Sequence, residues 1–349
     1  MQTGPITMVV DDRHHEHDPA YELNGGRRLE PRRERPARAT TIAAALTAAG
    51  HPRLDARPHG LAPIEAVHDP EMVAFLRDGH DAWRAAGGDE VMIPDTFRSP
   101  RWAAGGRRGA SAIGAAGWWV FDTATPIVAG SWLAARAAAD VALTAVDELT
   151  GGARAVYGLT RPPGHHAGPD YLGGFCLVNH AAIAARALTA GGRVAIVDVD
   201  VHHGNGTQDV FATDPAVLYT SVHGSPDHLF PFFSGYADER GHDAGLGTTR
   251  NLPLDAGAGD VAFLAAVEQA CLEVARFDPA SIVVSLGFDA AAGDPIGSLA
   301  VSRSGFAALG RRLAALDRPT VLVQEGGYDL DQLGALAVAT LAAFTPEPS

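Results

Sequence analysis

Residues 193–208 read RVAIVDVDVHHGNGTQ, and the fold and chemistry of the chain are best approached from this stretch. The apolar, β-branched run Val194–Val197 predicts a buried strand. Because successive side chains of a strand alternate between its faces, Asp198, Asp200 and His202 are expected to project the same way. Charged groups at the end of an apolar strand are costly unless they are paired or bind a metal, so the stretch predicts half of a zinc site. The alternative is an ion-paired aspartate in a turn with solvated histidines.

The composition is that of an acidic chain with a large core. It has 349 residues, 46% of them hydrophobic, and a net charge of −14, which fits one α/β domain over residues 1–349. We expect no nucleic-acid partner, because no basic run of useful length lies outside Arg27–Arg38, itself interpreted as a solvated face. Only Cys176 and Cys271 occur, which favours a reducing, cytoplasmic location. Neither a signal peptide nor a membrane span is predicted, so no membrane partner is expected.

Strands and helices alternate along most of the chain. This order predicts an α/β fold, with a doubly wound parallel sheet covered by helices on both faces. Asp69 is predicted to cap a helix that stops at Gly87-Gly88, and Asp260 to cap another. The predicted strands are Ile6–Val10, Ala153–Leu159, Val194–Val197, Ala216–Val222, Ser281–Leu286 and Thr320–Gln324, and the predicted helices are 37–49, 131–150, 181–189, 261–276, 305–316 and 332–344.

Four of the predicted strands are each followed by a polar cluster. Ligands of open parallel sheets bind beyond the carboxyl ends of the strands, so these clusters should converge on one crevice. Together they hold metal ligands, bases and an acid, which indicates the active site of a metallohydrolase. The clusters are RPPGHHAG with His165-His166, DVDVHH with Asp198, Asp200 and His202, GFDAAAGDP with Asp289, and QEGGYDL with Tyr328.

Each residue type suits one task. Asp200, His202 and Asp289 would bind one Zn²⁺ and leave a position open, as catalytic sites require. His165 or His166 would take a proton from the attacking water.

Two further tasks fall to the remaining polar residues. Tyr328 would donate its hydroxyl to the developing oxyanion, although core packing is its alternative. Asp198 and Asn205 would orient the imidazoles, and a structural ion site is the alternative for Asp198.

The motifs PPGHHAGPDYLGGFCLVN, DVDVHHGNGTQ, SLGFDAAAGDP and QEGGYDL resemble those of the zinc-dependent histone deacetylase superfamily, of arginase/deacetylase fold. Within it, the chain is most similar to the bacterial acetylpolyamine amidohydrolases. That likeness depends on YELNGGRRLEP (Tyr21–Pro31), on a long insert at 87–130, and on Leu229–Gly235 with Tyr236.

The resemblance implies roles for individual residues. His166 would be general base and acid, with His165 as its electrostatic partner and Tyr328 as oxyanion donor. The remaining implied sites are a zinc site at Asp200, His202 and Asp289, a K⁺ site near Asp198, Asp200, His202, Ser221 and Val222, and a narrow channel between Gly174, Phe175, Phe230 and Ile296.

The resemblance also implies a substrate class and a homodimer. The expected substrate is a slender acylated amine, an acetylpolyamine, with acyl-lysine as the alternative; an arginase-like ureohydrolase and an inactive acyl-ligand binder rank lower. The insert would form the dimer interface, and its tryptophans Trp102, Trp118 and Trp119 either face a partner or plug the loop onto the core.

One departure concerns the distal ammonium of a polyamine. Relatives meet it with acidic residues of the insert, but Ala110 and Phe121 stand at the aligned positions, and Phe175 stands where tyrosine is common. Glu22 and Asp122 are the remaining acidic candidates.

Overall fold

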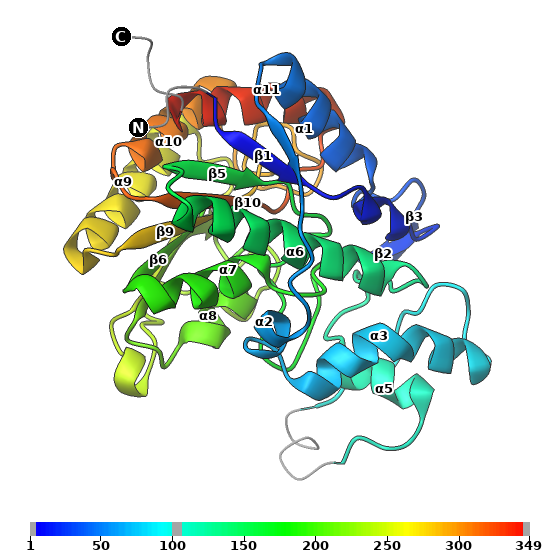
Figure 1. Ribbon diagram of the computed structural model, residues 1–349. Coiled ribbons are helices and arrows are strands. Elements are labelled where there is room, and N and C mark those ends of the chain that lie inside the picture. The colour runs from blue at the N-terminus through cyan, green and yellow to red at the C-terminus, as the bar shows by residue number, and fades with distance from the viewer. Residues whose placement is uncertain (1–4, 100–106, 345–349) are drawn as a thin grey trace.

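The computed structural model describes residues 5–99 and 107–344, and within them an eight-stranded parallel sheet organises the chain (Figure 1). The predicted α/β fold is confirmed. The strand order is β4-β1-β5-β10-β9-β6-β7-β8. The strands are β1 (Thr7–Val10), β4 (Arg53–Asp55), β5 (Ala155–Gly158), β6 (Val194–Asp198), β7 (Val217–Gly224), β8 (Thr249–Leu254), β9 (Ser281–Leu286) and β10 (Thr320–Gln324).

Helices cover both faces of the sheet (Figure 1). Alternate residues of a strand enter two separate hydrophobic cores: Ile196 packs with α6 and α7, whereas Ala195 packs on the opposite face with α1, α9, α10 and α11. This alternation explains why the strands read as continuous apolar runs. The helices are α1 (Ala37–Ala48), α2 (Ala62–Glu65), α3 (Pro70–Ala85), α5 (Ala112–Trp119), α6 (Ser131–Thr150), α7 (His180–Leu188), α8 (Asn205–Phe211), α9 (Asp260–Phe277), α10 (Arg303–Ala314) and α11 (Leu330–Leu341).

The two edge strands, β4 and β8, and a small hairpin were not predicted. The hairpin joins β2 (Glu22–Asn24) to β3 (Arg27–Leu29) through Gly25 and Gly26, whose φ angles of 57° and 73° suit a tight two-residue turn. The edge strands are short or polar, so they carry little apolar signal.

The prediction that residues 27–38 form a solvated face is wrong at its end. Arg38 lies 2% exposed in the first turns of α1, beside the buried Glu34. Arg38 is buried despite its positive charge, because the Glu34 carboxylate pairs with it.

Of the two predicted helix caps, one is confirmed and one is wrong. Asp69 caps α3, accepting from the Glu71 N–H at 2.7 Å. Asp260 does not cap α9, which Gly259 precedes; its carboxylate instead accepts from the Ser302 N–H and hydroxyl at 2.7 and 2.6 Å. The carboxylate is thus used to hold the start of α10.

The insert contains α5 and packs against α3, although its sequence showed no sustained periodicity. Trp119 is 4% exposed and belongs to the core, and Trp118 packs against that core. These two tryptophans therefore pack the insert onto the core, which was one of the two interpretations of the sequence, and they do not form an exposed aromatic surface. Trp102 lies outside the described residues. No described helix is long and apolar enough to cross a membrane.

Candidate active site

The carboxyl ends of β5, β6, β9 and β10 bring the four polar clusters to one edge of the sheet, as the sequence predicts. Strand β6 ends at Asp198, and Asp200 and His202 lie in the following loop rather than in the strand. The register pairs Asp198 with Ser285 of β9 and Ser221 of β7, so the residues that follow the strands start at the same level.

Asp200, His202 and Asp289 form a buried cluster in which one ligand atom of each lies within 4.8 Å of the others. His202 Nδ1 is 3.1 Å from Asp200 Oδ1 and 3.3 Å from Asp289 Oδ2. Asp289 Oδ1 accepts from the Val201 N–H at 2.9 Å, but Asp289 Oδ2 is buried without a hydrogen-bond donor in the described residues.

This donor set fits a metal ion. Burial, with the neighbouring Asp200, raises the pKa of Asp289 to about 7, because two carboxylates share a dry site with too little compensating positive charge. The backbone at Gly326 approaches both carboxylates so closely that only glycine fits there: a Cβ would lie 2.0 Å from Asp289 Oδ2 and 2.5 Å from Asp200 Oδ2. Two carboxylates and an imidazole are ligands that zinc accepts in catalytic sites.

The two histidines of the HHAG motif have opposite environments. His165 Nδ1 lies 3.0 Å from Asp198 Oδ2. Burial opposes the charged form of His165, but Asp198 and Asp200 outweigh it and raise the pKa to about 10. Burial and the adjacent His165 hold the pKa of His166 well below its usual value, and its Nδ1 lies 2.7 Å from Asn205 Oδ1. One imidazole is therefore a cation and the other a neutral base.

Tyr328 lies in the turn after β10, and this turn is held from two sides. The Tyr328 N–H donates to Asp294 Oδ2 at 2.7 Å. The Arg38 guanidinium donates to the Gly327 and Glu325 carbonyls at 2.6 and 2.5 Å, and its central carbon lies 4.5 Å from the centre of the tyrosine ring. Burial raises the pKa of Tyr328, so its hydroxyl stays protonated.

Two aromatic rings that are predicted to line the channel, those of Phe230 and Phe175, lie beside residues of the site. The Phe230 ring centre lies 4.9 Å from that of His166 and 6.3 Å from that of His202, and the Phe175 ring centre lies 5.7 Å from that of Tyr328. Gly174 has φ 58°, and a Cβ there would lie 2.3 Å from His166 Cδ2. Glycine is thus required both by its backbone conformation and by the close approach of the ring.

Two other residues that were predicted to bind the substrate, Ile296 and Glu22, make hydrogen bonds within the protein. Ile296 is half-buried, and its N–H donates to Asp294 at 3.0 Å. Glu22 is 1% exposed and accepts from the Arg33 N–H at 3.1 Å, so it does not present a free carboxylate to solvent.

Asp122 and Phe121 of the insert contact Gly174 and Phe230, two residues that are predicted to line the channel. Asp122 accepts from the N–H groups of Gly174 and Ala124 at 2.6 and 2.9 Å and from the Thr125 hydroxyl at 3.0 Å. These hydrogen bonds hold the Gly174 turn, and the expected contact of Asp122 with a distal ammonium stays a prediction. Phe121 stacks on Phe230 with the ring centres 5.9 Å apart.

Several residues around the site were missed by sequence reasoning. Glu325 accepts from the Gly164 and His165 N–H groups at 2.6 and 3.2 Å, and its place directly after β10 could have identified it. The Tyr219 hydroxyl donates to Asp198 at 3.1 Å. Arg38 and Asp294 hold the Tyr328 turn through its backbone groups, and no sequence pattern marks such partners.

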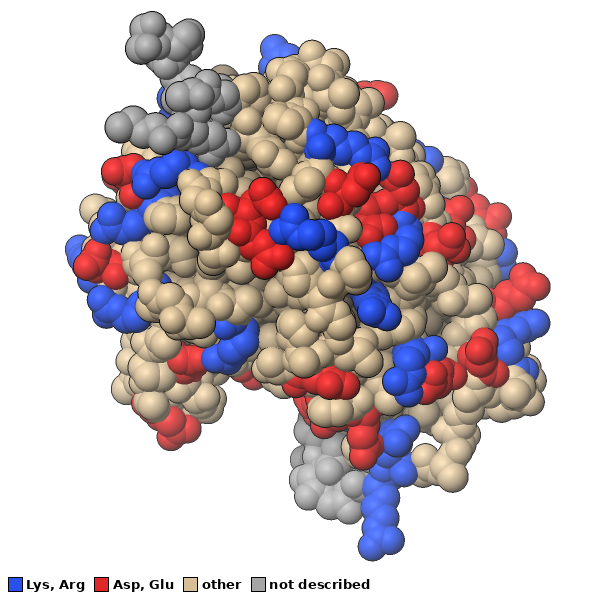
Figure 2. Space-filling model, in the orientation of Figure 1, with Lys and Arg blue, Asp and Glu red and all other residues tan. Residues whose placement is uncertain are grey.

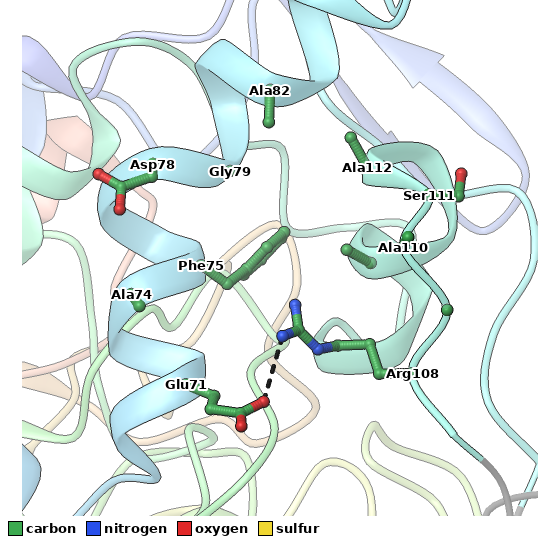
Figure 3. A pocket seen from close by; sticks show the side chains of 12 residues that line it. Glu71, Ala74, Phe75, Asp78, Gly79, Ala82, Arg108, Ala110, Ser111 and Ala112 are labelled. Carbon is green, nitrogen blue, oxygen red and sulfur yellow. Dashed lines mark hydrogen bonds and ion pairs between the residues drawn. The ribbon is translucent and has the colours of Figure 1, made fainter.

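A separate cavity of about 540 Å³ lies between α3 and α5, the helix of the insert (Figure 3). Glu71 and Arg108 pair across it at 3.1 Å, and Phe75 lies on its wall with Ala110 and Ala112. None of the residues that line it belongs to the polar clusters, so it is distinct from the candidate active site.

Comparison with known proteins decides the family, because the model of the histone deacetylase domain matches residues 32–344. The chain belongs to the histone deacetylase family. The predicted deacetylase superfamily and α/β fold are thereby confirmed.

Members of this histone deacetylase family that resemble the chain over nearly its full length include bacterial proteins. It is 40% identical over 342 residues to acetylpolyamine amidohydrolase 1 of Pseudomonas aeruginosa, covering 97% of this chain and 99% of that protein. It is 42% identical over 332 residues to acetylpolyamine amidohydrolase of Burkholderia pseudomallei, covering 94% and 95%. A crystal structure of the acetylpolyamine aminohydrolase from B. pseudomallei superposes with a TM-score of 0.93 at 39% identity, covering 97% and 98% of the two chains.

Proposed function

We propose that this histone deacetylase family member is a zinc-dependent amidohydrolase that removes the acetyl group from a slender acylated amine, an acetylpolyamine. The observation that carries the proposal is the buried Asp289 Oδ2, which has no donor in the described residues and faces His202 Nδ1 at 3.3 Å. The similarity to four bacterial acetylpolyamine amidohydrolases supports the substrate class.

Asp200, His202 and Asp289 would hold one zinc ion per chain. When bound, the ion supplies Lewis acidity, which polarises the amide carbonyl and acidifies the attacking water. The chain supplies the proton transfers. His166 keeps a hydrogen on Nδ1 for Asn205, which leaves the Nε2 lone pair free to take a proton from water and later return it to the departing amine.

His165 and Tyr328 would stabilise the negative charge that develops. His165 stays cationic beside Asp198, and its charge keeps His166 neutral and ready to act as a base. The Tyr328 hydroxyl would donate to the carbonyl oxygen as it becomes an oxyanion, an interaction that strengthens in the transition state.

A second substrate class is favoured by one observation. Phe121 stacks on Phe230, and Asp122 is committed to Gly174, so these two insert residues offer no free carboxylate for a distal ammonium. Acyl-lysine or a neutral acylated amine is therefore the second candidate.

A substrate panel tests the proposal. The zinc-loaded chain, the chelator-treated chain and the chelated chain with zinc restored are each assayed for acetate release from acetylputrescine, acetylspermidine and an acetyl-lysine peptide. We expect the highest kcat/KM for an acetylpolyamine and loss of activity on chelation. Acetate release from none of these amides by the zinc-loaded chain would refute the proposal, and faster release from the peptide would favour the second candidate.

Four further parts of the proposal concern a second ion, the domain organisation, the location and the oligomeric state. A potassium ion near Asp198, Ser221 and Val222 would offset the buried carboxylate where β6 meets β7. The chain would be one domain located in the cytoplasm, and it would form a homodimer through the insert at 87–130. Sedimentation as a monomer at micromolar concentration would contradict the dimer.

Surface charge offers no single-sign region on the face that Figure 2 shows, where acidic and basic side chains are interspersed. Charged side chains of the described residues also pair at the surface, as Arg57 does with Asp147 and Glu148. Such a face suits the expectation of a small-molecule substrate rather than nucleic acid.

A further inference from the structure

The backbone of Asn205 is fixed, but its side-chain amide can turn over. Asn205 is the first residue of α8, and the first turn of this helix packs against the HHAG loop. The Thr207 N–H donates to the His165 carbonyl at 3.1 Å. A Cβ on Gly206 would lie 2.3 Å from the Ala167 carbonyl oxygen, so the two backbones are in close contact. The oxygen and NH₂ ends of an amide have nearly the same shape, so packing alone does not choose between them. Hydrogen-bond partners must make the choice.

The orientation of this amide determines which nitrogen of His166 carries the proton. With Asn205 Oδ1 2.7 Å from His166 Nδ1, the hydrogen lies on Nδ1 and Nε2 keeps a lone pair. If the amide turned over, its NH₂ would donate to Nδ1, the hydrogen would move to Nε2, and His166 could not accept a proton there.

Tyr171 contacts the other end of the amide. Asn205 Nδ2 donates to the Tyr171 hydroxyl oxygen at 3.4 Å, and that hydroxyl donates to the Asn205 main-chain carbonyl at 3.3 Å. The Asp209 carboxylate is a second acceptor for this hydroxyl. Since the one hydrogen points to the carbonyl or to that carboxylate, the oxygen presents a lone pair to the amide and favours NH₂ over oxygen. Burial raises the pKa of Tyr171, so the hydroxyl is neutral.

Packing holds the Tyr171 ring in place. A Cβ on Gly168 would lie 2.2 Å from Tyr171 Cζ, and the ring meets Phe121 edge to face with the centres 5.7 Å apart. Replacing the hydroxyl by hydrogen should therefore leave the ring where it is.

We propose that Tyr171 is a positioning residue that selects the amide orientation of Asn205 and, through it, the Nδ1–H form of His166. The inference rests on the proposed function, in which His166 takes a proton from water.

A double-mutant experiment tests it with the zinc-loaded chain and the best substrate of the panel. Tyr171→Phe should lower kcat about threefold to tenfold, the effect of losing one modest hydrogen bond, with little change in KM. In an Asn205→Asp background the same change should have no further effect, because the two oxygens of a carboxylate are equivalent. Tyr236→Phe, which removes a hydroxyl bonded to Asp227 at 3.1 Å, is the matched control and should change nothing.

A second measurement does not depend on activity. In the chain labelled with ¹⁵N-histidine, the His166 signals, identified by their loss in His166→Ala, should report one Nδ1–H form. In Tyr171→Phe the Nε2–H form should appear as well. A single Nδ1–H form in Tyr171→Phe, or a loss of kcat that is equal with and without the Asn205→Asp substitution, would overturn the inference. Absence of hydrolysis by the unmodified chain would instead count against the proposed function.

Discussion

The buried ion cluster at Glu34 allows a stability prediction with a magnitude. Arg161 binds Glu34 with two hydrogen bonds of 2.9 and 2.8 Å, and Arg38 binds it with one of 2.9 Å. The three side chains are 1%, 2% and 3% exposed for Arg161, Arg38 and Glu34. Glu34→Gln would leave two buried guanidinium groups without their shared carboxylate.

Two independent arguments give similar values for the free energy of unfolding that Glu34→Gln should remove. Breaking a buried pair by removing one partner typically costs about 3–5 kcal/mol. Burial by itself would raise the pKa of Glu34, but Arg161 and Arg38 outweigh it and lower the pKa from 4.5 to about 2. That difference corresponds to roughly 3 kcal/mol of stabilisation of the folded state. We therefore expect Glu34→Gln to lower the free energy of unfolding by about 3–5 kcal/mol at pH 7.

Urea unfolding at pH 7 measures the change, with Glu30→Gln as the matched control. Glu30 is half exposed and pairs with the exposed Arg28, so its loss should cost at most about 0.5 kcal/mol. The Glu34 contribution is complete above the unfolded pKa near 4.5 and is lost as the pH falls through the folded pKa. The difference between the unmodified chain and Glu34→Gln should thus be constant from pH 7 to about 4.5 and shrink below that. A loss no larger than that of Glu30→Gln would refute the reasoning.

Three other predictions concern the site and the pH dependence of the fold. Asp289→Ala should abolish zinc binding and activity, because an underfilled site remains; full zinc occupancy by metal analysis would show that the ligand set is wrong. Tyr328→Phe should keep the zinc content and KM and lower kcat by about 10²–10³, the usual effect of losing an oxyanion donor, whereas a near-normal kcat would exclude that role. His68 donates from Nδ1 to the Gly168 carbonyl at 2.8 Å and accepts the Asn179 N–H on Nε2 at 2.9 Å, and burial lowers its pKa to about 4. As the pH drops, this histidine takes up a proton in the unfolded chain before it does so in the folded chain, so the stability of the fold falls from about pH 6.5 towards pH 4. The thermal unfolding temperature of His68→Gln should therefore depend less steeply on pH over that range than that of the unmodified chain. Parallel pH profiles of the two proteins would contradict this.

The central strands and the polar residues after them were predictable. Runs such as Ser281–Leu286 and Thr320–Gln324 are apolar and β-branched because helices cover both faces of the sheet, and the structure has both strands with these same bounds. A parallel sheet places the carboxyl ends of its strands at one edge, so Asp200, His202 and Asp289 could be brought together without coordinates.

Elements with weak apolar signals escaped prediction. Strand β4 has an exposed, polar sequence, Arg53–Asp55, and lies at the sheet edge, where one neighbour suffices. Helix α5 is rich in alanine, glycine and tryptophan and has no polar face, so its period is hidden.

The sequence by itself determined the parallel α/β sheet, the cluster of metal-binding side chains and the family, because these depend on local periodicity and on residues adjacent to strand ends. Only the tertiary structure decided that Arg38 holds the turn before Tyr328, that Asp122 holds the Gly174 turn, and that Tyr171 contacts the amide of Asn205. These contacts join residues that are distant in sequence, from 34 positions for Tyr171 and Asn205 to 289 for Arg38 and Gly327. No repeating pattern marks such pairs, since the partner is often a backbone N–H or carbonyl whose position depends on how helices and loops pack onto the sheet.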